Sequence, residues 1–134
     1  MDISHDEYGV MSFDPERRVL ELEWLEATAR MTEDDFKGSL ERLATGAEDH
    51  RPQGILVDVR HFRFSPGPDF GAWRDEHIIP RYNAAGVERF AFLVPEDAAP
   101  SSLPSHEGPA TFPTGYFDSR DAIEAWFRGE TDSR

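Results

Sequence analysis

The sequence predicts an α/β fold, in which a mixed sheet of roughly four or five strands opens with an antiparallel hairpin and is packed by about three helices. Three observations carry this prediction. A stretch of alternating apolar and charged residues lies near the N-terminus, two short apolar runs follow it, and segments with helical spacing of apolar residues separate these runs. Strands that alternate with helices are typically parallel and joined by right-handed crossovers.

The opening hairpin is predicted over residues 8–24. Residues 8–13 have the composition of a short strand, and residues 14–17 have the composition of a type I turn. Residues 18–24 alternate strictly, with Leu20, Leu22 and Trp24 on one side and Glu21 and Glu23 on the other. We therefore expect this strand to bury its apolar side and to expose its glutamates, where they discourage pairing with another sheet edge.

Capping residues and apolar spacing predict three helices. Thr32 and Asp35 form a capping-box pattern ahead of the first helix. Asp69 is the predicted N-cap of the second helix, which Pro80 cannot continue without a kink because proline lacks an N–H. Asp118 is the predicted N-cap of the last helix.

Two short apolar runs are predicted to be buried, parallel strands that lie side by side. The first is Ile55–Val57, which ends at Asp58, and the second is Phe90–Val94. A shorter last strand is expected over Thr114–Phe117. The segment 95–113 holds five prolines and has no periodicity, so we expect a mobile loop or lid there.

The length of 134 residues predicts a single domain. We place this domain at residues 8–128, with a flexible N-terminus over residues 1–7 and a frayed C-terminus over residues 129–134. The first residues lack the basic and apolar regions of a signal peptide, and no window is long and apolar enough for a membrane-spanning helix. A cytoplasmic location without membrane insertion is therefore expected.

Charge and composition narrow the expected chemistry. The chain has 27 acidic and 14 basic residues, a net charge of −13, so we expect no nucleic-acid partner. There is no cysteine, which excludes disulfides and thiol catalysis. The five histidines have no metal-ligand spacing, and no phosphate-binding or nucleophile motif is present. We therefore expect no metal site, no cofactor and no catalytic residue.

Residues at one strand end and on the second helix are candidates for a ligand or partner surface. Asp58 lies at the carboxyl end of a predicted central strand, where open α/β sheets bind ligands, or it pairs locally with Arg60. Trp73 and His77 lie four positions apart on one side of the second helix, beside Glu76. They are expected to line a pocket with Asp58 or to form a dimer surface, unless Trp73 packs in the core.

Four short segments beyond the hairpin are typical of one family. They are Ile55–Arg60, Ile79–Arg81 together with Trp73, Ala85–Pro95, and Phe117–Ser119 ahead of Ala122, Trp126 and Phe127. With the hairpin they span residues 8–128, and there the chain resembles a STAS-like domain. This family comprises small bacterial proteins related to anti-sigma-factor antagonists and to the CRAL-TRIO lipid-transfer fold.

The resemblance implies a non-catalytic binding module that docks a protein partner, or a second copy of itself, through the region around the second helix. Antagonists of this family are phosphorylated on a Ser or Thr after the third strand. Ser65 is the nearest hydroxyl here, slightly before the matching position, in a loop that contains two prolines. The lipid-transfer side of the resemblance implies an alternative, a carrier of a small apolar or amphipathic ligand between sheet and helices.

A third hypothesis is an enzyme that uses Asp58 with His61 or His77. Each hypothesis makes a geometric demand. A cavity above roughly 300 Å³ would favour the carrier, and a symmetric interface of about 1,000 Å² built from the second helix would favour a homodimer. The enzyme requires the three side chains to meet in one place.

Overall fold

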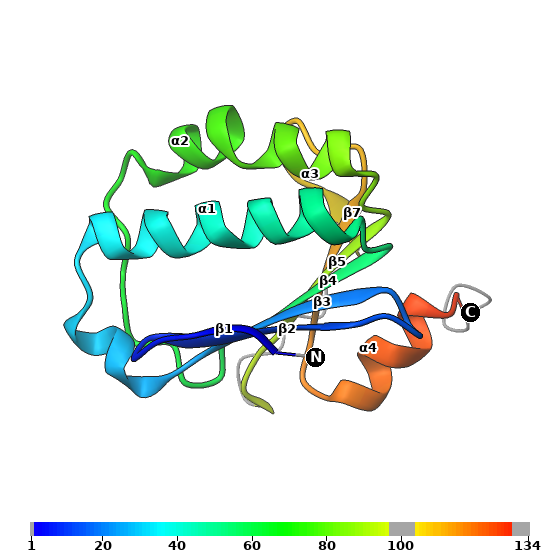
Figure 1. Cartoon of the computed structure of the whole chain (residues 1–134), viewed down its shortest axis with the longest axis horizontal. Coiled ribbons are helices and arrows are strands. Elements are labelled where there is room, and N and C mark those ends of the chain that lie inside the picture. The colour runs from blue at the N-terminus through cyan, green and yellow to red at the C-terminus, as the bar shows by residue number, and fades with distance from the viewer. Residues whose placement is uncertain (1, 97–103, 130–134) are drawn as a thin grey trace.

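The computed structural model describes residues 2–96 and 104–129, and these form an α/β structure around one mixed sheet. Within these residues the sheet has seven strands in the order β1-β2-β3-β4-β5-β7-β6 (Figure 1). The strands are β1 (Asp2–His5), β2 (Gly9–Asp14), β3 (Val19–Trp24), β4 (Gly54–Asp58), β5 (Arg89–Leu93), β6 (Ser105–His106) and β7 (Pro113–Phe117). The predicted fold class is confirmed, and the sheet is wider than the four or five strands expected.

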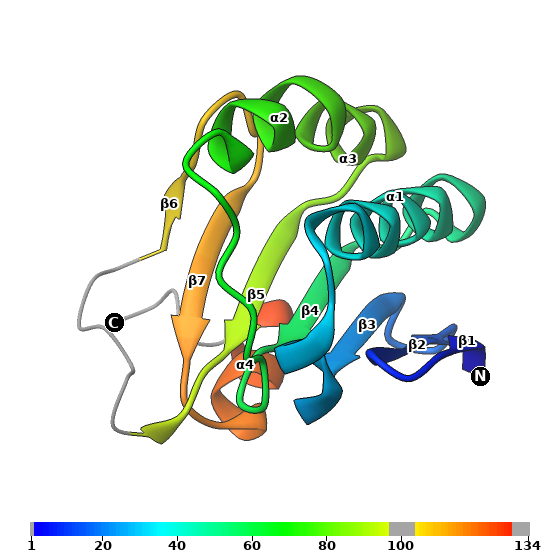
Figure 2. The ribbon, with the colours of Figure 1, turned by 90° about the vertical axis from the view of Figure 1, so that its left-hand side faces the viewer.

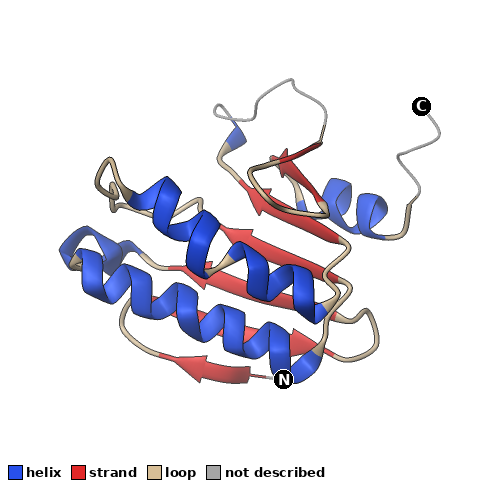
Figure 3. Cartoon of the chain, turned by 90° about the horizontal axis from the view of Figure 1, so that it is seen from above, coloured by secondary structure: helices blue, strands red, loops and turns tan. Residues whose placement is uncertain are grey.

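Helices cover both faces of the sheet. They are η1 (Glu26–Arg30), α1 (Glu33–His50), α2 (Phe70–His77), α3 (Ile79–Ala85) and α4 (Arg120–Phe127). The first three α-helices lie over one face, and α4 lies under the other (Figures 1 and 2). Seen from above, α1 runs alongside the row formed by α2 and α3 (Figure 3).

The central strands β3, β4, β5 and β7 are parallel, whereas β1, β2 and β6 pair antiparallel with their neighbours. The two apolar runs are neighbouring parallel strands, as predicted. They form β4 and β5, which pair from Gly54↔Arg89 to Asp58↔Leu93. The two crossover connections, from β3 to β4 and from β4 to β5, each lead to the next strand in the same direction across the sheet. Right-handed connections therefore place α1 and the α2–α3 pair on one face.

Two short edge strands were not expected. Asp2–His5, within the N-terminus predicted to be flexible, pairs with β2 as strand β1. In the proline-rich segment predicted to be a loop or lid, β6 pairs with β7, and Ala110 and Phe112 are buried in the core. The middle of that segment, residues 97–103, lies outside the described residues, as do residues 130–134 of the predicted frayed end.

Helix ends follow the sequence signals in part. The predicted capping box of α1 is present, with Thr32 Oγ1 accepting from Asp35 N and Asp35 Oδ2 accepting from Thr32 N. Asp69 is the N-cap residue of α2, as predicted, but its side chain makes no capping hydrogen bond. At α4 the cap is Ser119, which accepts from the amide of Ala122, and not Asp118. A hydroxyl one residue closer to the helix has taken the capping position.

Two apolar cores lie on the two faces of β4, which explains its continuous apolar sequence. Ile55 and Val57 pack with the side chains of α1 and α3, whereas Leu56 packs against α4. Every residue of β4 is buried. The ring of Phe127 packs closely on Gly54, where a Cβ would lie only 3.1 Å from the ring.

Candidate functional site

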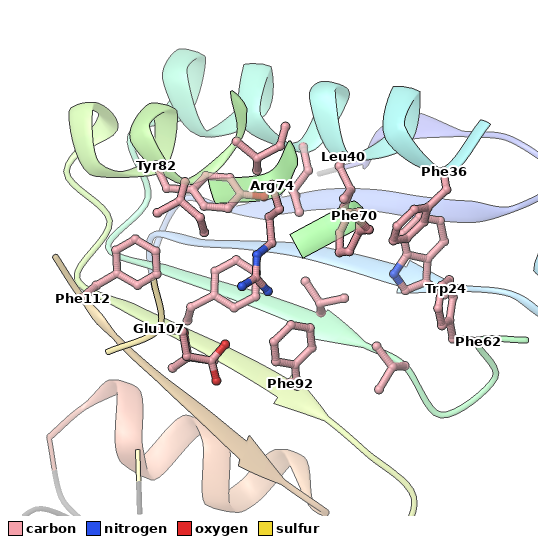
Figure 4. A pocket seen from close by; sticks show the side chains of 17 residues that line it. Trp24, Phe36, Leu40, Phe62, Phe70, Arg74, Tyr82, Phe92, Glu107 and Phe112 are labelled. Atoms are coloured by element: carbon pink, nitrogen blue, oxygen red, sulfur yellow. The ribbon is translucent and has the colours of Figure 1, made fainter. Parts of the chain in front are cut away.

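An apolar cavity lies between the sheet and the helices α1, α2 and α3, with a volume of about 130 Å³ (Figure 4). Its floor is formed by side chains of the parallel strands, namely Val57, Phe90, Phe92 and Thr114. Its roof is formed by side chains of the helices, namely Leu40, Leu43, Phe70, Ile78 and Tyr82. The cavity therefore sits on the predicted central strands.

The size of the cavity limits what it can hold. Pockets for drug-sized ligands have volumes of roughly 300–1,000 Å³, so this cavity does not reach the size expected of a carrier for such a ligand. It is close to an engineered protein cavity of about 150 Å³ that stays dry and binds benzene. The space is large enough for one aromatic ring or a short branched hydrocarbon, but too small to enclose a whole long acyl chain.

Aromatic clusters pack at the two ends of the cavity. At one end, Trp24, Phe36 and Phe62 have ring centroids 5.0–5.7 Å apart. At the other end, Phe90 lies 5.5 Å from Tyr82 and 6.1 Å from Phe112. Rings at these separations make favourable aromatic contacts, which stabilise both ends of the space.

Arg74 and Glu107 provide the charged groups of the cavity lining (Figure 4). Among the described residues, Nε of Arg74 is the one buried side-chain nitrogen or oxygen without a hydrogen-bond partner. The outer part of this side chain reaches Asp75, whose Oδ1 lies 3.5 Å from Nη2. A buried donor without an acceptor is costly in a folded protein, so Nε is a candidate donor to a bound acceptor.

Glu107 is held by Tyr116 of β7, whose hydroxyl donates to Oε2 at 2.8 Å. Burial raises the pKa of Tyr116 to about 12, and the hydrogen bond to the Glu107 carboxylate adds to this effect. Tyr116 therefore stays a neutral donor at ordinary pH. The positive charge of Arg74 acts on the pKa of the same tyrosine in the opposite direction.

The segment that carries Glu107 is fixed to α3 and α2. The side chain of Asn83 donates to the carbonyl oxygen of Pro109 at 3.0 Å and accepts from the backbone N–H of Thr111 at 2.9 Å. Gly108 has a φ of +57°, and its Cα lies against the carboxylate of Asp75. The turn that follows β6 therefore closes the polar end of the cavity.

The helix that covers the cavity is weakly anchored. None of the eight residues of α2 is buried, and its first turn has no side-chain cap. The segment between β4 and α2 rises from the end of the strand to the helix layer (Figure 2). It is tied to α1 by a hydrogen bond of 3.0 Å from the backbone N–H of Gly67 to Glu33.

The candidate pair Asp58 and Arg60 lies on the opposite face of the sheet. Asp58 is completely buried, and its carboxylate accepts hydrogen bonds from Nε and Nη2 of Arg60. Nη2 of Arg120, on α4, approaches it at 3.7 Å. Burial raises the pKa of Asp58, but the hydrogen bonds from Arg60 outweigh burial and hold this pKa below its ordinary value of 3.8. The local pairing, one of the two roles expected for Asp58, is therefore present.

The remaining candidates lie around α2 and do not meet Asp58. Trp73 is half-buried and contacts His77, with ring centroids 5.7 Å apart. Glu76 and Ser65 are exposed. The expected pocket that combines Trp73 and His77 with Asp58 does not form, because α2 and the carboxylate lie on different faces of the sheet. The arrangement required for the enzyme hypothesis is likewise absent, since His61 instead lies 3.8 Å from Glu26.

The predicted role of Glu21 and Glu23 also needs correction. Strand β3 is internal, paired with β2 on one side and β4 on the other, so these glutamates do not guard a sheet edge. Both oxygens of Glu21 accept from Arg120, at 3.1 and 2.6 Å. They belong instead to a charged cluster where α4 meets the sheet.

Sequence reasoning missed Arg74 and Glu107. A signal existed for Arg74, because it falls four positions from both Phe70 and Ile78, on the apolar side of its helix. A charged residue at such a position points toward the core. Glu107 lies in the proline-rich segment, which has no periodicity from which its direction could be derived.

No family model matches the chain, and neither a curated protein nor a solved structure is detectably similar to it. Within residues 2–96 and 104–129, no three histidine, aspartate or glutamate side chains come together as a metal-binding group. No helix in this part of the chain has the length and apolar character needed to cross a membrane. The cavity is therefore described by its own geometry alone.

Proposed function

We propose that this protein binds a small, mainly apolar molecule, about the size of one aromatic ring, in the cavity beneath α1, α2 and α3. The observation that carries the proposal is a 130 Å³ space lined by aromatic and branched apolar side chains. Cores are normally packed without such spaces, because the side chains that line them lose contacts. A ligand of matching size would recover those contacts. The proposed role is binding, without a catalytic step.

Ring-sized probes test this proposal directly. Toluene should bind to the purified chain, as seen by ligand-detected NMR and by a rise in the midpoint of thermal unfolding, because a ligand that binds only the folded state stabilises it. Leu40 is half-buried on α1 and lines the cavity, so Leu40→Phe should fill the space and abolish binding.

Leu25→Phe is the matched control, because Leu25 is also half-buried but does not line the cavity. It should leave toluene binding unchanged. If toluene does not bind the wild-type chain, or binds the Leu40→Phe variant equally well, the proposed site is wrong.

A second candidate function is docking of a protein partner or of a second copy of the chain, as the STAS-like resemblance implies. It is supported by Trp73 of α2, which is only half-buried and has Nζ of Lys37 5.1 Å from its ring centre. Sedimentation of the wild-type chain and of Trp73→Glu tests the homodimer. A dimer that dissociates in the variant supports it, and a monomer in both removes it.

A further inference from the structure

The two ends of the cavity differ in chemistry, and the polar end restricts the ligand. We propose that the ligand is a neutral, single-ring molecule with a hydroxyl group, which accepts a hydrogen bond from Nε of Arg74 and donates one to Glu107. This inference rests on the proposed function, since it names the class of molecule that the same cavity takes.

The first step concerns the acceptor. Arg74 is about one-third exposed through its outer atoms, but Nε is buried and has no hydrogen-bond partner. A guanidinium has only donors, so a group that satisfies it must present an oxygen or another acceptor. A pure hydrocarbon in the cavity would leave this buried donor unsatisfied, whereas a ligand with an acceptor would gain a hydrogen bond.

The second step concerns charge. Asp75 Oδ1 lies 3.5 Å from the guanidinium of Arg74, and Glu107 lines the same cavity. The carboxylate of Asp75 therefore already pairs with the one guanidinium, and that of Glu107 belongs to the same lining, in a chain whose net charge is −13. A carboxylate ligand would add a third negative charge to this end, and like charges at short range repel each other. The acceptor is accordingly neutral.

The third step distinguishes a hydroxyl from a carbonyl group. Tyr116 donates to Oε2 of Glu107, and a carboxylate has acceptor sites on both of its oxygens. A hydroxyl group can accept from Arg74 and donate to Glu107 at the same time, whereas a carbonyl can only accept. Figure 4 shows the guanidinium of Arg74 and the carboxylate of Glu107 at the same end of the cavity, with the rings of Phe92 and Phe112 beside them.

Phenol and toluene test this inference because they have nearly the same shape and differ by one hydroxyl in place of a methyl group. An apolar cavity without a partner for the hydroxyl would prefer toluene strongly, since burial of an unpaired hydroxyl is costly. We expect phenol to bind at least as tightly as toluene and more tightly than benzoate. We also expect the ¹⁵N–¹H signal of Arg74 Nε to shift with phenol but not with toluene.

Arg74→Met should weaken phenol binding about tenfold or more, the size expected for a hydrogen bond to a charged group, and so shift the ratio of the two affinities toward toluene. Arg81→Met is the matched control, because Arg81 pairs with Glu48 and does not line the cavity. It should change neither affinity. If Arg74→Met does not fold, the wild-type affinities for the three probes and the Arg74 Nε signal still test whether the cavity selects a hydroxyl group.

The outcomes separate this inference from the proposed function. If the chain strongly prefers toluene over phenol, the inference that the ligand has a hydroxyl group is wrong, but the proposed apolar binding cavity stands. Tighter binding of benzoate than phenol overturns the charge argument in the same way. If none of the three probes binds, the proposed function fails and the inference fails with it.

Discussion

Arg60 holds the buried carboxylate of Asp58 by two side-chain hydrogen bonds, from Nε to Oδ1 at 3.0 Å and from Nη2 to Oδ2 at 2.9 Å. The backbone N–H of Arg60 adds a third, to Oδ1 at 3.1 Å. The sequence separation is only two residues, so little chain entropy is lost in bringing the partners together. A carboxylate at the end of β4 is thereby satisfied within its own strand end, which explains how a buried charge is tolerated there.

Arg60→Met should lower the free energy of unfolding by about 2 kcal/mol, because it leaves the buried carboxylate with fewer partners. The loss stays below that of a fully buried pair, since Arg60 is partly exposed and Arg120 remains nearby. Chemical denaturation measures the change. Arg63→Met is the control, because the Arg63 side chain pairs with the exposed Glu26 and its loss should cost less than about 0.5 kcal/mol. Equal losses in both variants would refute a structural role for the Asp58 pair.

Asp58 should also make stability depend on pH in acid. Its pKa is lowered below 3.8 in the folded state, because the hydrogen bonds from Arg60 outweigh the effect of burial. The stabilising contribution is therefore complete above the unfolded value of 3.8, and it is lost as the pH falls through the folded-state pKa. Asp58→Asn should be less stable at neutral pH and should show a flatter loss of stability below pH 3.8. If the free energy of unfolding falls equally steeply with pH in the variant and in the wild type across this range, Asp58 does not have a lowered pKa in the folded state.

Tyr116 and Tyr82 should lose their hydroxyl protons at a higher pH than an ordinary tyrosine. Burial, followed by the hydrogen bond to Glu107, raises the pKa of Tyr116 to about 12, and burial raises that of Tyr82 as well. For Tyr116, the stabilising contribution is complete below the unfolded value of 10.0, and it is lost as the pH rises through about 12. Tyrosinate absorbance follows this titration, and Tyr116→Phe identifies the transition.

Glu107→Gln isolates the contribution of the carboxylate. The pKa of Tyr116 should fall in this variant but remain above 10.0, because burial, the largest cause of the shift, is unchanged. A return to the ordinary value would mean that the carboxylate rather than burial dominates the environment of Tyr116, and an unchanged pKa would mean that the two side chains do not interact.

The central layer could be predicted from sequence because its signals are local. The apolar runs of β4 and β5 are bounded by polar residues, and burial on both faces of a parallel sheet requires such runs. The capping box of Thr32 and Asp35 likewise depends on four consecutive residues. Strands β1 and β6 could not be predicted in this way, because they are short and mostly exposed and are defined by their pairing with β2 and β7.

The cavity could not be predicted, because it arises from the distance between layers rather than from any one segment. Its floor, its roof and its polar end come from segments far apart in the chain. The position of Arg74 within the apolar side of α2 is the one local sign of it. The predicted site residues Asp58 and Trp73 do not meet, because they lie on different faces of the sheet. Sequence alone does not show this difference.

Two glycines around the cavity make a matched pair for testing how α2 is held in place. At Gly108 a Cβ would lie 2.7 Å from Oδ1 of Asp75, and the φ of +57° is one that side chains rarely adopt. Gly108→Ala should therefore cost about 1–2 kcal/mol of unfolding free energy. At Gly71, inside α2, a Cβ would meet nothing within 4 Å, so Gly71→Ala should stabilise the chain by roughly 0.5–1 kcal/mol through helix propensity.

The same pair separates stability from the geometry of the polar end. Gly108→Ala must displace the carboxylate of Asp75, and with it the neighbouring guanidinium of Arg74, so phenol binding should weaken more than toluene binding. Gly71→Ala adds a methyl group in open space and should leave the ratio of the two affinities unchanged. If both variants shift the ratio equally, ligand selection follows the stability of α2 rather than the placement of Arg74 by the Gly108 turn.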